Sequence, residues 1–139
     1  MPQFDPLTSD SLDCFGPGAA FHHIGMVVRE IESTCPGLEK FFDPVQDVSV
    51  AFVNLHGATV EFIEPGSPTS PVTNSLTRGF KLVHICYSVP DLEAAIAHVK
   101  QRGFRLIAPP VPAVAFGQRQ IAWVFHQALG LYELLELAV

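Results

Sequence analysis

The segment LVHICYSVPDLE (Leu82–Glu93) has the composition of a buried strand that leads into a helix, and a histidine lies within its strand. Leucine, valine, isoleucine and cysteine surround His84. A buried imidazole without partners costs about 1–3 kcal/mol in desolvation. We therefore expect polar groups from elsewhere in the chain to meet this ring.

The same pattern occurs earlier, in HIGMVVREIE (His23–Glu32), which aligns with HICYSVPDLE (His84–Glu93). Histidine, isoleucine, valine and glutamate coincide, and two further pairs are conservative. Each copy predicts an apolar strand followed by an acidic residue and the start of a helix.

The second copy marks its helix clearly, because Asp91 suits the N-cap and Gly103 suits the end. The apolar stripe of this helix has four members: Leu92, Ala95, Ile96 and Val99. In the first copy Pro36 and Gly37 interrupt the pattern, so we expect a short or kinked helix there.

A second repeat follows in the same order. TVEFIE (Thr59–Glu64) aligns with LYELLE (Leu131–Glu136), which pairs Glu61 with Glu133, and both stretches have strand-like patterns. Two ordered matches predict two related halves, each running strand, helix and several strands. The further strands are VSVAFVNL in the first half, before a turn at His56-Gly57, and RLIA and QIAWVF in the second.

Composition excludes several classes of function. The 139 residues are 48% hydrophobic and 16% charged, with a net charge of −6, and the eight Lys and Arg are scattered. We therefore expect no nucleic-acid partner and no membrane partner, since there is no basic patch and no apolar run of about 18 residues. The three cysteines follow no C-x-x-C spacing, so we expect reduced thiols and a cytoplasmic protein.

Each half offers one histidine on its first strand and one glutamate on its last. If the halves pack by pseudo-twofold symmetry, four side chains can converge on one point: His23, Glu61, His84 and Glu133. Two imidazoles and two carboxylates suit one divalent ion, namely zinc, cobalt, manganese, nickel or iron. Two coordination positions would stay open for water or substrate.

Taken singly, each of these residues has a simpler interpretation, because a lone strand histidine is usually a core residue and a lone glutamate usually faces solvent. Their repetition in matching positions favours the metal site. Strand alternation predicts that His22 lies on the opposite face from His23, near the surface, and that Glu64 and Glu136 lie opposite the chosen acids. Three histidines in predicted turns or on the helix are left out: His56, His98 and His126.

At these residues the sequence resembles the vicinal oxygen chelate superfamily, and within it the methylmalonyl-CoA epimerase and glyoxalase branch. The matching elements run from FHHIGMVV, starting at Phe21, to the final GLYELLE. The resemblance implies an α+β fold of two βαβββ modules that form a cupped, incomplete barrel around one metal. It maps the family's four ligands onto the same set, His23, Glu61, His84 and Glu133.

The predicted organisation is a flexible N-terminal arm over residues 1–20 and one domain over residues 21–139. Module one covers about 21–64, a linker with one helical turn about 65–79, and module two about 80–139. Compared with typical epimerases, the connection FFDPVQD before VSVAF is about a strand shorter. Where the epimerases carry a second acid/base glutamate before that strand, this sequence holds Val45, Gln46 and Asp47.

The predicted chemistry is proton transfer next to a metal-bound carbonyl group, with Glu133 as both ligand and base. Gln118 and Arg119 are candidates to orient the substrate, and Cys86 is a candidate to line the cavity. We expect a small-molecule substrate, and leave a homodimer open. Three hypotheses compete: an isomerase or lyase acting through an enolate, an iron ring-cleaving dioxygenase, and a metal-free binding or resistance protein.

Overall fold

A computed structural model describes residues 3–5 and 12–137. The first half contains β1 (Ala20–Val27), the short helix α1 (Ile31–Thr34), β2 (Phe41–Asp43), β3 (Val48–Leu55) and β4 (Ala58–Pro65). Helix α2 (Thr73–Thr77) lies between the halves. The second half contains β5 (Leu82–Val89), α3 (Leu92–Lys100), β6 (Arg105–Leu106), β7 (Val111–Ala113), the 3-10 turn η1 (Val114–Phe116), β8 (Arg119–His126) and β9 (Gly130–Glu136).

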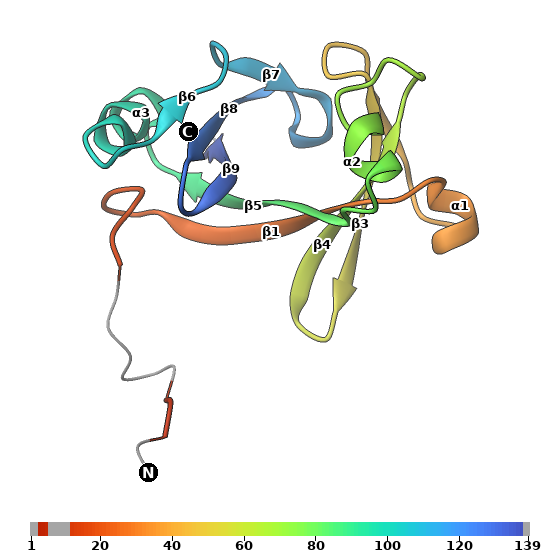
Figure 1. The fold of residues 1–139 in the computed structure, drawn as a ribbon, viewed down its shortest axis with the longest axis horizontal. Coiled ribbons are helices and arrows are strands. Elements are labelled where there is room, and N and C mark those ends of the chain that lie inside the picture. The colour runs from red at the N-terminus through yellow and green to blue at the C-terminus, as the bar shows by residue number, and fades with distance from the viewer. Residues whose placement is uncertain (1–2, 6–11, 138–139) are drawn as a thin grey trace.

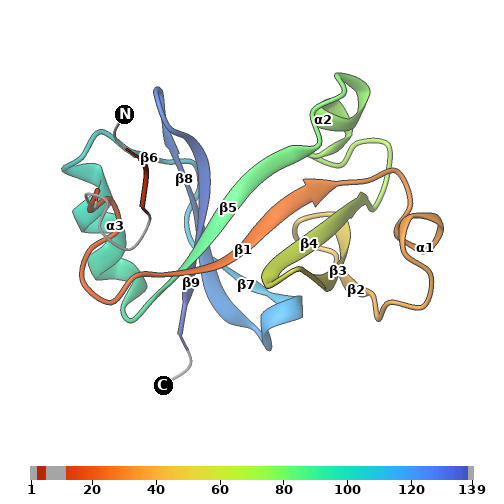
Figure 2. The same cartoon turned by 90° about the horizontal axis from the view of Figure 1, so that it is seen from below.

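All strands join one open, mixed sheet in the order β2-β3-β4-β1-β5-β9-β8-β6, with β7 paired to β8. Strands β1 and β5 run antiparallel side by side through the middle of the molecule, and the two halves curl away from them (Figures 1 and 2). Each central strand pairs in parallel with the last strand of its own half, β1 with β4 and β5 with β9. The α+β fold with two related halves is therefore confirmed.

In each half, a glutamate at the end of the last strand accepts a hydrogen bond from a backbone N–H group at the start of the helix. Glu64 at the end of β4 accepts a hydrogen bond from the backbone N–H of Ile31 at 2.8 Å. Glu136 at the end of β9 accepts one from the N–H of Leu92 at 3.0 Å. A carboxylate is favourable at a helix N-terminus, where N–H groups lack partners within the helix. These acids therefore have structural roles on the face away from Glu61 and Glu133.

The local predictions from turn and cap residues are confirmed. Asp91 caps α3 by accepting a hydrogen bond from the N–H of Ala94 at 3.1 Å. His56 and Gly57 have φ values of 51° and 95°, which are the positive values that a tight hairpin turn requires. Helix α1 has only four residues and ends before Pro36.

The structure adds two features to these predictions, one in the first half and one near the N-terminus. The segment FFDPVQD contains a strand, because Phe41–Asp43 pairs with Val48–Val50 of β3. Within the arm predicted as flexible, Phe15 is buried, with an exposed fraction of 9%, and packs with Tyr87 and Phe104. Burial of a phenylalanine side chain stabilises the folded state by roughly 1.5–3 kcal/mol, which favours packing of this segment against the domain. Residues 1–2 and 6–11 of the arm lie outside the described residues.

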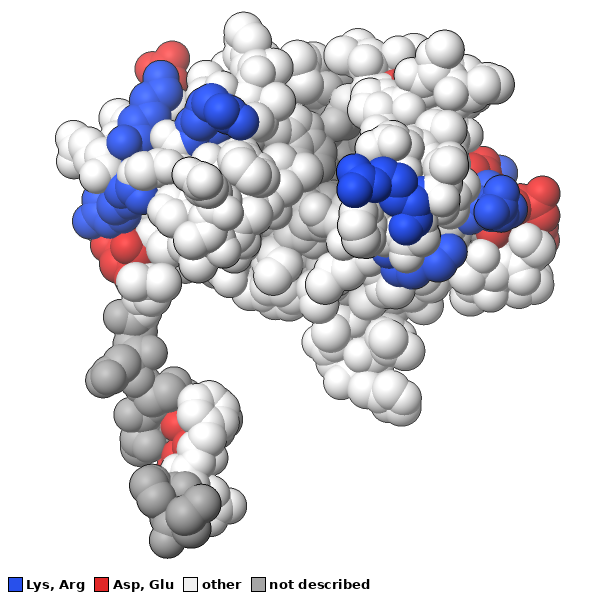
Figure 3. All heavy atoms as spheres, viewed as in Figure 1, with Lys and Arg blue, Asp and Glu red and all other residues white. Residues whose placement is uncertain are grey.

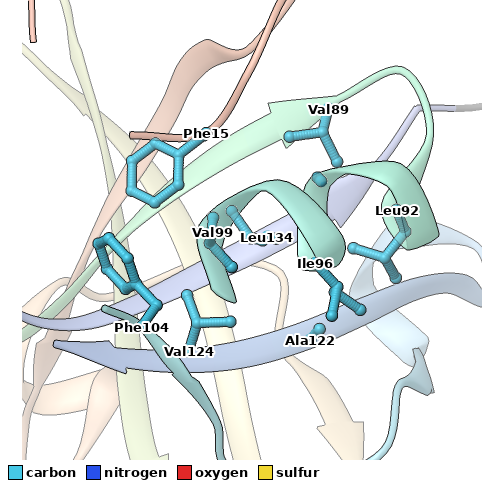
Figure 4. Close-up of a cluster of buried hydrophobic side chains, with 10 residues drawn as sticks. Phe15, Val89, Leu92, Ile96, Val99, Phe104, Ala122, Val124 and Leu134 are labelled. Atoms are coloured by element: carbon cyan, nitrogen blue, oxygen red, sulfur yellow. The ribbon is translucent and has the colours of Figure 1, made fainter. Parts of the chain in front are cut away.

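The main core lies in the second half, where α3 covers β8 and β9 (Figure 4). Its buried members include the predicted helix stripe, Leu92, Ala95, Ile96 and Val99, together with Phe15. Within the described part of the chain, no helix is both long enough and apolar enough to cross a membrane.

Candidate metal centre

The four repeated residues stand on the four central strands: His23 on β1, Glu61 on β4, His84 on β5 and Glu133 on β9. Glu61 pairs across the sheet with the residue two after His23, which is Gly25. Glu133 pairs in the same way with the residue two after His84, which is Cys86. The same register in both halves brings the four side chains together.

All four side chains are buried, and their donor atoms face one another. Nε2 of His23 lies 3.1 Å from Oε1 of Glu133 and 3.5 Å from Oε1 of Glu61. Nε2 of His84 lies 3.3 Å from Oε1 of Glu133 and 3.5 Å from Oε1 of Glu61. The two Nε2 atoms are 3.3 Å apart.

This arrangement fits a divalent ion. Donors that bind one ion at about 2.1 Å lie roughly 3.0–3.4 Å apart for bond angles between octahedral and tetrahedral values. The observed separations of 3.1–3.5 Å match that spacing. Oε1 of Glu133 is buried and makes no hydrogen bond of good geometry among the described residues, although both Nε2 atoms lie within 3.3 Å of it. An orphaned carboxylate oxygen beside two imidazoles is what an ion would satisfy.

The glutamates and histidines of the site shift one another's pKa values. Burial alone would lower the pKa of His23, but the carboxylates of Glu133 and Glu61 outweigh it and raise that pKa to about 9. Burial would raise the pKa of Glu133, yet the two histidines lower it below the usual value for a glutamate. In the absence of metal the site therefore holds a proton on His23 at neutral pH.

A glycine leaves room for the His84 ring. Gly25 lies opposite His84 across β1 and β5. A Cβ atom on Gly25 would lie 2.7 Å from Nε2 of His84 and closer still to two other ring atoms, so a side chain there would overlap the imidazole. The Trp123 ring packs edge-on against the His84 ring, with centroids 4.7 Å apart. The His84 ring is therefore held between β1 and β8.

Gly25→Ala is expected to displace the His84 ring and weaken metal binding by about 10- to 100-fold, the range for losing the support of a ligand. The φ angle of Gly25 is not positive, so the substitution acts through the ring rather than through backbone strain. Competition against a chromophoric chelator measures the affinity. The control is Met26→Ala, at the next position of β1. Unchanged affinity in Gly25→Ala would contradict the role assigned to the glycine.

His22 does not lie where simple alternation places it. It is half-buried, and its Nδ1 atom is 2.8 Å from Nδ1 of His23. Burial and the charge of His23 lower the pKa of His22. The cause of its position is a register shift in β1 between Phe21 and His23, which interrupts the alternation of side chains.

A cavity of about 460 Å³ lies next to the four residues, and Glu61, His84 and Glu133 form part of its wall. Most of the remaining wall is apolar, including Val50, Ile63, Val83, Val111 and Phe116. No Lys or Arg from the described part of the chain lines it.

A polar network that the sequence analysis missed supports one side of the cavity. Buried Asp43 accepts hydrogen bonds from Nε2 of Gln46 at 2.9 Å and from the N–H of Val114 at 3.4 Å. Oε1 of Gln46 accepts one from Nε1 of Trp123 at 3.2 Å. The network thus links β2 to the second half and to the tryptophan that packs on His84. Only the unpredicted strand β2 brings Asp43 there.

The three residues predicted to contact substrate lie outside the described cavity wall. Gln118 is exposed with a φ of 67°, and Nε of Arg119 donates to the carbonyl of Phe116 at 3.0 Å. Cys86 is fully buried, and burial raises the pKa of its thiol. Contact of these three residues with a substrate stays a prediction.

The sheet of two related halves, with histidines and glutamates at its centre, defines a class of protein. The model of the Glyoxalase/Bleomycin resistance protein/Dioxygenase superfamily matches residues 22–123. The chain belongs to this superfamily.

Among the relatives that match this chain are epimerases. Mitochondrial methylmalonyl-CoA epimerase of Mus musculus is 30% identical over 77 residues, which are 54% of this chain and 43% of that protein. Ethylmalonyl-CoA/methylmalonyl-CoA epimerase of Cereibacter sphaeroides is 30% identical over 74 residues, 52% of this chain and 55% of that protein. The aligned region thus spans about half the length of these relatives.

A solved structure with a similar fold is a hypothetical protein from Bacillus halodurans, with a TM-score of 0.74 and 27% identity. The match covers 88% of this chain and 96% of that one. Streptomyces coelicolor methylmalonyl-CoA epimerase in complex with 2-nitronate-propionyl-CoA has a TM-score of 0.69 and 21% identity. That match covers 86% of this chain and 97% of the other and shows similarity of fold.

Proposed function

We propose that the protein is a divalent-metal-dependent isomerase or lyase that forms an enolate from a small carbonyl or acyl-thioester substrate. One observation carries the proposal. Two imidazole nitrogens and two carboxylates lie within 4.8 Å of one another at the wall of a cavity. The names of the epimerase relatives support it.

The ligands we propose are His23, Glu61, His84 and Glu133, and the ion is zinc, cobalt, manganese, nickel or iron. When bound, it would supply Lewis-acid chemistry, stabilising negative charge on a substrate oxygen. Glu133 is the proposed base, because its carboxylate lines the cavity directly beside the two imidazoles that would hold the ion. It would take the proton next to the substrate carbonyl and return it to the enolate.

The cavity wall indicates the character of the substrate. Apart from the metal-binding groups, the polar residues that line it are Asp43, Gln46 and Ser75. On the face shown in Figure 3, Lys and Arg side chains lie over the two halves and leave the centre without cations. A wall without cations does not neutralise a second carboxylate or phosphate within it. We therefore propose a substrate with one chelating carbonyl end and an uncharged, apolar body.

A binding protein without catalysis is the second candidate, because an apolar cavity of about 460 Å³ is itself a site for a small molecule. A binding protein of this kind would bind an apolar small molecule with the same affinity in the presence and in the absence of metal. An enzyme that chelates its substrate would bind it much more tightly with metal.

The test of the proposed function is metal titration of chelator-treated protein with each of the five metals. We expect one equivalent to bind with release of a proton, since the pKa of His23 is about 9 without metal. Below pH 9 the metal competes with that proton, so affinity should fall by about tenfold per pH unit as the pH drops. Cobalt-loaded protein should change its visible spectrum on addition of acetohydroxamate. Protein that takes up none of the five metals would refute the metal-dependent function.

A further inference from the structure

Strand β1 contains a bulge next to the metal centre. Phe21 and His23 pair with the consecutive residues Tyr87 and Cys86 of β5, so His22 is an additional residue on the β1 side. A bulge of this kind re-aims side chains, and bulges are common next to functional sites. Here it turns the ring of His22 toward the ring of His23 rather than away from it.

The contact between the two rings joins defined atoms. The Nδ1 atoms of His22 and His23 are 2.8 Å apart, a distance at which one nitrogen donates a proton and the other accepts it. Nε2 of His23 faces the other three donor atoms of the metal centre. When Nε2 binds an ion, the ring proton must be on Nδ1, which makes His23 the donor and His22 the acceptor.

The surroundings of His22 hold it in this position. Its ring is half-buried and packs edge-on against Phe116, with the ring centroids 5.5 Å apart. The Phe116 ring also packs against His23, with centroids 5.8 Å apart. One aromatic side chain thus contacts both imidazoles and limits their rotation.

We propose that His22 is a positioning residue of the metal centre, which accepts the Nδ1–H hydrogen bond of His23 and so directs Nε2 of His23 at the ion. This role rests on the proposed metal site. Outer partners of this kind fix the orientation and tautomer of a histidine ligand and raise its basicity. His84 is supported differently, by the space at Gly25 and by the Trp123 ring.

A second ion between His22, His23 and Cys86 is the competing explanation, since one ligand atom from each lies within 4.8 Å of the others. The surroundings of the thiol disfavour it. Cys86 has no exposed surface and packs in an apolar cluster with Ala113, Ile121 and Leu135.

The test compares His22→Ala, His22→Asn and the wild type, with His56→Ala in an exposed turn as the control. Zinc affinity is measured by chelator competition, and the ring N–H signals of zinc-loaded, 15N-labelled protein are recorded by NMR. We expect His22→Ala to lose about 10- to 100-fold in affinity and to lose the exchange-protected Nδ1–H signal of His23. The asparagine of His22→Asn offers an acceptor oxygen, so this variant should recover most of the affinity and the signal.

Three results would overturn the proposal. The first is wild-type affinity and an unchanged His23 signal in His22→Ala. The second is equal weakening in the alanine and asparagine variants with intact thermal unfolding, which would indicate general packing. The third is a second zinc equivalent in the wild type that is absent from His22→Ala. Failure of the wild type to bind any zinc, cobalt, manganese, nickel or iron would instead refute the proposed function itself.

Discussion

Replacing His84 by alanine is expected to produce protein that binds no metal at micromolar concentrations, and His23→Ala should do the same. Each histidine supplies one of only two nitrogen donors, and each Nε2 lies within 3.5 Å of both carboxylates. The loss should exceed the roughly 10- to 100-fold effect expected for an outer partner such as His22. The loss of metal affinity is measured in two ways: by the metal content after dialysis, and by isothermal titration of the metal-free variants.

The matched control for the histidine variants is His56→Ala, because His56 lies in an exposed hairpin turn. It should bind metal as the wild type does. Thermal unfolding of the metal-free proteins shows whether each variant is folded. Retention of a full equivalent of tightly bound metal by folded His84→Ala would contradict the four-ligand site.

Glu133→Gln is expected to retain some metal and to lose exchange of the substrate's α-proton with deuterated water. The amide oxygen can still coordinate, but the amide cannot accept a proton as a carboxylate does. General-base catalysis contributes typically 10²- to 10⁴-fold, so exchange should fall by about that factor. NMR follows the exchange on a simple acyl thioester, and metal analysis on the same sample separates loss of base from loss of metal.

Glu136→Gln is the control, because the two acids are three residues apart on the same strand but face different environments. Oε2 of Glu136 accepts the backbone N–H of Leu92 at the start of α3, whereas Glu133 faces the two histidines. Glu136→Gln should keep both metal and exchange and should lower stability by about 0.3–1 kcal/mol through the helix terminus. Loss of metal in Glu136→Gln with none in Glu133→Gln would contradict the assigned roles.

The histidine and the glutamate that each half contributes to the metal centre could be predicted from the sequence, because both occur twice in matching positions. A strand pattern with one histidine, followed later by a strand with one glutamate, occurs twice in the same order. Each copy encodes its local structure through side-chain alternation and capping residues. Pseudo-twofold packing of the copies then brings His23, Glu61, His84 and Glu133 to within a few ångströms of one another.

The supporting residues could not be predicted in this way, since each depends on contacts between segments that are distant in the sequence. Strand β2 has only three residues and forms by pairing with β3, so its sequence has too few residues to show a period. Gly25 is required because the His84 ring from β5 lies over it. Phe15 is buried because α3 and β9 offer it a surface.

The sequence by itself thus determined the two related halves and the four central side chains, because periodicity and repetition are properties of neighbouring residues. Only the tertiary structure decided the surroundings of those side chains. The position of His22 illustrates the reason. Alternation along β1 sends it away from His23, but the register of β1 against β5 leaves one additional residue, and this bulge brings the two Nδ1 atoms to 2.8 Å. Register is fixed by pairing between strands, and one strand's own sequence does not contain it.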